Sequence, residues 1–174
     1  MSRAYQAGPK ARGLPFLLLL AGAAACTGGS SMRSAPDAFA GLPLHHVFTG
    51  PRALAAIQRL HGTGAIKLVS AWVAGYGDER ASAMLYVGVA PDAAGARQLL
   101  QDMERSVENR PMPFHDLRRI VVAGRDVGML SGQGQLHFLF VRGSRVVWAS
   151  IDEHRACAAL KQLLGHAPGE GATG

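Results

Sequence analysis

The stretch LRRIVVAGRDVGMLSGQGQLHFLFVRGSRVVWASI, residues 117–151, decides the fold of this chain. It holds four runs rich in β-branched and aromatic residues, LRRIVVA, VGMLS, QLHFLFV and RVVWASI, which the segments GRD, GQG and RGS separate. Short strands about ten residues apart with glycine between them are typical of an antiparallel meander. We assign Gly132 and Gly134 to a hairpin turn, because GQGQLH lacks the third glycine of a dinucleotide-binding loop and leads into a strand.

Periodicity outward from the meander predicts further helices and a hairpin. Pro51 suits the first position of a helix, and an apolar stripe from Ala93 to Val107 at helical spacing indicates a second helix packed on the core. The predicted helices cover residues 49–62, 91–109 and about 153–164, and the predicted paired strands cover about 65–76 and 82–89.

The order of these elements predicts the fold class. Strands do not alternate singly with helices, which argues against a doubly wound parallel sheet. We therefore expect an α+β fold: a single, mainly antiparallel sheet of about six strands with two to three helices packed on one face.

The amino-terminal residues predict export. Leu14–Ala25 gives twelve apolar or small residues, whereas a helix that spans a bilayer needs roughly 20. Arg3, Lys10 and Arg12 precede this run, and a basic leader before a short apolar segment is the pattern of a secretory signal peptide. We expect residues 1–25 to be such a signal.

The sequence AAAC, residues 23–26, resembles the lipobox of bacterial lipoproteins. The resemblance implies that Cys26 is acylated and becomes the new amino terminus, so that the lipid bilayer itself is a partner. Thr27 is not the aspartate that signals inner-membrane retention in this class, which favours the periplasmic face of the outer membrane in a Gram-negative host. AAA also satisfies the A-x-A rule for ordinary signal cleavage, and in that case a disulfide between Cys26 and Cys157 is chemically allowed.

The remaining chain divides into three parts. Residues 26–41 are rich in Gly, Ser, Ala and Pro and predict a flexible tether behind the lipidated cysteine. Residues 42–165 are expected to form a single α+β domain, and residues 166–174 a disordered tail. The net charge of +6 includes three bases of the signal, and this modest surplus together with export argues against a nucleic-acid partner.

Catalytic and metal-binding motifs are absent from the sequence. HExxH, CxxC and GxSxG do not occur, and no two histidines share a ligand spacing. His61 and His137 are the weak candidates for a metal site built from distant residues. Cys157 in the last predicted helix is expected to pack as a small apolar residue, and Trp72 and Trp148 are expected in the core.

Two functions remain open at this level. The first is a membrane-anchored envelope lipoprotein without a cofactor, whose domain binds an envelope protein or supports an assembly and is not an enzyme. The alternative is a periplasmic domain, with enzymatic activity left open, that binds a small ligand or a metal through dispersed histidines such as His61 and His137.

Overall fold

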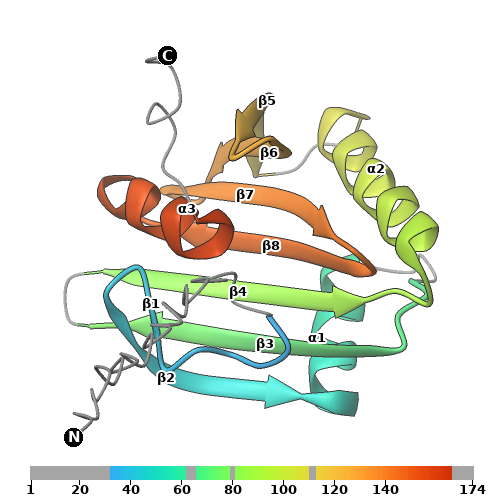
Figure 1. Cartoon of the computed structure of the whole chain (residues 1–174), viewed down its shortest axis with the longest axis horizontal. Coiled ribbons are helices and arrows are strands. Elements are labelled where there is room, and N and C mark those ends of the chain that lie inside the picture. The colour runs from blue at the N-terminus through green and yellow to red at the C-terminus, as the bar shows by residue number, and fades with distance from the viewer. Residues whose placement is uncertain (1–31, 62–65, 79–80, 110–112, 166–174) are drawn as a thin grey trace, which may run out of the picture.

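The computed structural model describes residues 32–61, 66–78, 81–109 and 113–165 (Figure 1). Within these residues the chain forms strands, three α-helices and one 3₁₀ turn. In chain order they are β1 (Ala38–Phe39), β2 (Leu42–Thr49), α1 (Gly50–His61), β3 (Ser70–Gly77), β4 (Ser82–Val89), α2 (Ala93–Asn109), β5 (Phe114–Val122), β6 (Arg125–Gly132), β7 (Gln135–Arg142), β8 (Arg145–Ile151), the 3₁₀ turn (Glu153–Arg155) and α3 (Ala156–Leu164).

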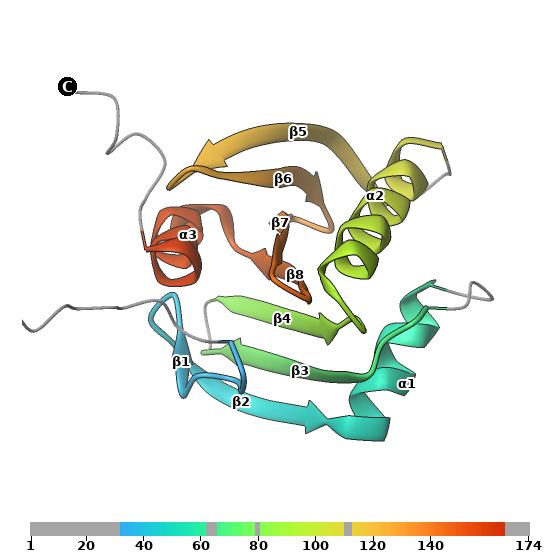
Figure 2. The same ribbon diagram turned by 45° about the vertical axis from the view of Figure 1, so that its right-hand side comes forward.

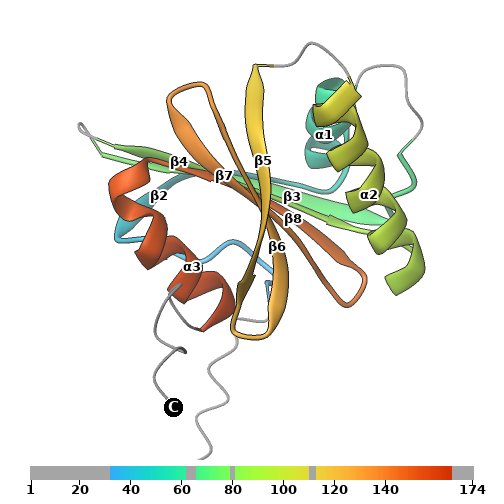
Figure 3. The same ribbon diagram turned by 90° about the horizontal axis from the view of Figure 1, so that it is seen from above.

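All the strands belong to one antiparallel sheet in the order β1-β2-β3-β4-β8-β7-β6-β5. The sheet twists strongly and curls into a half-barrel, so that β5 crosses β3 and β4 steeply in Figure 3. The α+β class and the single antiparallel sheet are therefore confirmed. The predicted number of about six strands is wrong, because the sheet has eight.

The two strands that the sequence does not reveal are β1 and β2. The β2 segment LPLHHVFT holds a proline and two histidines, so its intrinsic strand preference is weak. It forms a strand because β3 offers it a partner, and the register joins Val47 to Ala74 and Thr49 to Trp72. Long-range pairing thus overrides local preference at this edge of the sheet.

The meander β5-β6-β7-β8 is confirmed. Ala123 and Gly124 connect β5 to β6 with φ of 51° and 70°, and Gln133 and Gly134 connect β6 to β7 with φ of 52° and 77°. Positive φ at both central residues is the geometry of the tight turn whose twist matches two adjacent strands. Gly134 is therefore a turn residue, as predicted, whereas Gly132 ends β6.

The concave face of the sheet is filled by α3. Leu160 and Leu163 of α3 are almost fully buried, and they belong to one apolar cluster with Leu85, Phe138 and Phe140 of the sheet. Figure 2 shows α3 inside the curl, between the strands β5 to β8 and the strands β2 to β4. The hydrophobic core of the protein therefore lies within the half-barrel.

The convex face carries the other two helices. Ala53 and Ile57 of α1 pack on Ala71 and Val73 of β3, and α2 packs on the β6–β8 region through residues such as Met103. Successive residues of a strand point to opposite faces of the sheet. Trp72 therefore packs in the concave core, whereas its neighbour Val73 packs on the convex face. The prediction that all helices pack on one face is wrong, because α1 and α2 cover one face and α3 the other.

The domain begins before the predicted boundary at residue 42. Met32 and Phe39 are 6% and 0% exposed, and Trp72 Nε1 donates a hydrogen bond of 3.2 Å to the carbonyl oxygen of Met32. The ring of Phe39 packs on Tyr76 with centroids 5.5 Å apart. The predicted flexible tether over residues 26–41 is therefore wrong for residues 32–41, which lie on the concave face, while residues 26–31 and 166–174 lie outside the described residues.

Glycines on the convex face make room for side chains that lie flat across the strands. A Cβ atom at any of four sheet glycines would stand within 3.3 Å of such a side chain. The pairs are Gly75 with His46, Gly88 with Leu68, Gly128 with Glu104, and Gly132 with Phe114. Because these glycines have no side chain, residues from other parts of the sequence can lie directly on the backbone of the sheet.

We predict that Gly132→Ala destabilises the fold by about 1–3 kcal/mol. The new methyl group would stand 2.5 Å from the carbonyl oxygen of Pro113 and would also collide with the ring of Phe114, so backbone must move. Gly95→Ala in α2 is the matched control, since its methyl group meets only ordinary contacts and alanine favours a helix. Urea denaturation measures both changes; equal stability of the two variants would contradict the packing described here.

Candidate functional site

The structure describes two of the three residues that the sequence nominated, and His61 and His137 lie on separate elements. Cys26 lies outside the described residues. His61 ends α1, and its Nδ1 lies 2.9 Å from the carbonyl oxygen of Ile57 in the same helix. His137 lies in the middle of the meander on β7 and is 3% exposed.

Both ring nitrogens of His137 are engaged within the protein. Trp148 Nε1 donates a hydrogen bond of 2.9 Å to His137 Nδ1, which makes Nδ1 the acceptor. His137 Nε2 lies 3.0 Å from the carbonyl oxygen of Gly132 and therefore carries the proton that it donates there. In this arrangement His137 has no free lone pair for a metal ion. Across the described parts of the chain, no three His, Cys, Asp or Glu side chains gather as a metal site would require.

An aromatic cluster surrounds His137. The ring centroids of Phe114 and His137 are 4.9 Å apart, and those of Phe114 and Trp148 are 5.2 Å apart. Burial lowers the pKa of His137 below its ordinary value of 6.5, because a charged ring would be poorly solvated there. We interpret this cluster as a structural one: the hydrogen bonds of its polar groups are satisfied, and it fixes the packing of β5 on β7 and β8. Trp72 is confirmed as a core residue.

A second buried polar contact joins α2 to the edge strand β5. Glu104 of α2 is only 5% exposed, which is unusual for a carboxylate. Arg119 donates a hydrogen bond to the carboxylate of Glu104. Burial raises the pKa of Glu104, and the positive charge of Arg119 partly opposes that shift. Arg119 is thus a structural partner of Glu104, although its own side chain is 64% exposed.

Cys157 differs from its prediction. It was expected to be a buried apolar residue of the last helix, but it is exposed near the start of α3. The apolar face of α3 is formed instead by Ala159, Leu160 and Leu163, which point into the half-barrel.

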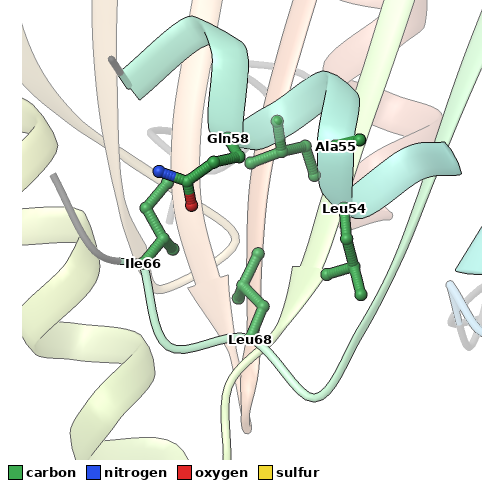
Figure 4. A pocket seen from close by; sticks show the side chains of 6 residues that line it. Leu54, Ala55, Gln58, Ile66 and Leu68 are labelled. Carbon is green, nitrogen blue, oxygen red and sulfur yellow. The ribbon is translucent and has the colours of Figure 1, made fainter. Parts of the chain in front are cut away.

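The convex side of the molecule carries an apolar groove beside α1. The groove has a volume of about 290 Å³ and lies between α1 and the segment that leads into β3. Figure 4 shows the labelled α1 side chains on one side of it and Ile66 and Leu68 on the other. Its lining consists of Leu54, Ala55, Ile57, Gln58, Ile66 and Leu68. We call this feature the α1 groove.

The described lining of the α1 groove is mainly apolar. Gln58 is the one polar residue among these six described residues, and none of the six is titratable. Enzyme and cofactor sites usually combine an apolar wall with several converging polar groups. Sequence reasoning missed the groove because it placed Ile66 and Leu68 in a longer strand, whereas β3 begins only at Ser70.

Comparison with known proteins finds no relative of this chain. No family model, no curated protein and no solved structure matches the chain. No helix among the described residues is both long and apolar enough to cross a bilayer.

We predict that acid weakens the fold through His137. Its pKa is lowered in the folded state, so its contribution to stability is complete above about pH 6.5 and falls as the pH drops below that value, where the unfolded chain takes up the proton. The measurement is the free energy of unfolding between pH 7.5 and about pH 5 for the wild type and His137→Leu. The variant should be less stable at pH 7.5 and should lose less stability on acidification; parallel curves would contradict the assignment.

Proposed function

We propose that this chain is a lipid-anchored protein of the bacterial cell envelope whose α+β domain binds another envelope protein without catalysing a reaction. The anchoring half rests on the sequence, in which a basic leader, a twelve-residue apolar run and AAAC at residues 23–26 follow one another. Two or three acyl chains on Cys26 would hold the protein firmly, since each buried methylene contributes about 0.8 kcal/mol.

The α1 groove is the single observation that supports the binding half. Its volume of about 290 Å³ lies at the lower limit of small-molecule sites, which are about 300–1,000 Å³. An apolar groove beside a helix, with little polar lining, matches the way proteins take up a few apolar side chains of a partner segment. We therefore propose a short apolar segment of an envelope protein as the occupant. The metal-binding alternative receives no such support, because His137 is engaged on both nitrogens.

Anchoring is tested with Cys26→Ser. The wild-type protein should sediment with envelope membranes, and its amino-terminal peptide should carry the mass of a diacylglyceryl group on Cys26. Cys26→Ser should accumulate as an unprocessed, unlipidated precursor. Mass spectrometry of the amino-terminal peptide decides the matter, and a wild-type peptide with an unmodified thiol would reject lipidation.

Partner binding is tested with Ala55→Glu. Ala55 is exposed on the rim of the groove, so glutamate there should leave the fold intact while placing a charge against the apolar occupant. Ala158→Glu on the exposed side of α3 is the matched control. Quantitative co-purification from solubilised envelopes should show at least about tenfold loss of bound protein for Ala55→Glu and no loss for the control. Equal recovery with both variants would reject the groove as the binding site.

A further inference from the structure

The part of the chain that forms the α1 groove carries bases and no acid. The chain has 12 Asp and Glu residues, but none of them falls within residues 38–77, which include Arg52, Arg59 and Lys67. These 40 positions supply β1, β2, α1 and β3. The third strand that α1 contacts, β4, also contains no Asp or Glu. Neither α1 nor the strands beneath it can therefore neutralise the bases.

The three bases are exposed and have no ionic partner in the fold. Arg52, Arg59 and Lys67 take part in none of the ion pairs found among the described residues. An exposed base elsewhere differs, because Arg105 on α2 pairs with Asp102 of the same helix. The surface around α1 is thus a local concentration of uncompensated positive charge, which attracts an acidic partner.

One base lies beside each wall of the groove. Arg59 follows Ala55 by four residues on α1, and side chains four apart are neighbours on a helix surface. Lys67 stands between Ile66 and Leu68, whose side chains form the opposite wall in Figure 4. A molecule in the groove would therefore lie between two positive charges.

Exposed apolar side chains accompany these bases. Leu60 and Val69 are 61% and 63% exposed, and each lies next to a residue that borders the groove, Arg59 or Leu68. With Val47 of β2, they account for three of the four large apolar side chains that are most exposed in the described chain. Uncompensated bases and apolar surface therefore occur together around the groove, which suits an occupant with both apolar and acidic side chains.

We propose that the occupant of the α1 groove is an acidic amphipathic segment of the partner protein. Its apolar side chains enter the groove, and its flanking Asp or Glu side chains pair with Arg59 and Lys67. This inference rests on the proposed function and specifies the chemistry of the partner. Opposite charges accelerate association and fix the orientation of the segment, whereas a basic segment is repelled.

Carbodiimide cross-linking tests the proposed pairing, because it joins a carboxylate directly to an amine. Beyond the predicted signal the sequence has two lysines, Lys67 beside the groove and Lys161 on α3 at the other face of the sheet. In envelopes that contain the full chain, we expect an amide bond between Lys67 and an Asp or Glu of another protein. Lys161 should form no such bond. Mass spectrometry of the cross-linked peptide identifies the partner segment, which should combine apolar and acidic residues.

Charge reversal measures the contribution of the rim. Arg59→Glu should reduce co-purification of the partner from solubilised envelopes at least about fivefold, because repulsion replaces an ion pair. Lys161→Glu is the matched control, since both bases are exposed in the last turn of a helix, and it should cause no loss. Raising the salt from about 0.05 M to about 0.5 M should weaken binding of the wild type and have less effect on Arg59→Glu. Circular dichroism checks folding, and Arg59→Gln, which should cause a smaller loss, replaces Arg59→Glu if that variant does not fold.

Three results would overturn the inference. The first is a cross-link from Lys161 in place of Lys67, or none from either lysine. The second is an equal loss of partner in Arg59→Glu and Lys161→Glu, since binding would then follow net charge alone. The third is binding of the Cys26→Ser chain to phosphatidylglycerol vesicles that Arg59→Glu abolishes, because the bases would then serve a membrane.

The failure of this inference is distinguishable from that of the proposed function. If Ala55→Glu releases the partner while Arg59→Glu retains it and Lys67 forms no cross-link, the groove binds a segment that is not acidic. If neither Ala55→Glu nor Arg59→Glu changes recovery, the groove is not the binding site and both proposals fail.

Discussion

The fold depends on the burial of α3 within the curl of the antiparallel sheet. A twisted sheet of eight strands has a concave face that must be covered, and Leu160 and Leu163 cover it against Phe138 and Phe140. Burying such side chains contributes about 1.5–3 kcal/mol each, more than any surface ion pair in the molecule. The same face receives Met32, so the helix at the carboxyl end and the start of the described chain share one core.

Two buried polar side chains link neighbouring elements of the fold. His137 links Trp148 of β8 to Gly132 of β6, and Glu104 links α2 to β5 through Arg119. The buried side chains of His137 and Glu104 each have a hydrogen-bond partner, which avoids the cost of about 1–3 kcal/mol for an unsatisfied group. Neither contact resembles a catalytic arrangement, because the reactive atoms face their partners and not an open cavity. The α1 groove on the convex face supports the proposed binding of a partner.

A domain held by Cys26 would carry the α1 groove on its convex face and present it to another protein. The span between Cys26 and Met32 is short, so the domain would rest close to the membrane and not extend from it on a long tether. The packing of residues 32–41 on the concave face is the structural reason for this difference from the sequence-based expectation.

The sequence by itself determined the elements whose signals are local. The meander, its glycine turns, α2 and its apolar stripe are readable because they depend on spacing of two or 3.6 residues and on positive φ. Tertiary structure alone decided that LPLHHVFT becomes β2, that the helices divide between two faces, and that Ile66 and Leu68 face α1. These features depend on contacts between segments distant in the chain, which no local pattern of residues encodes.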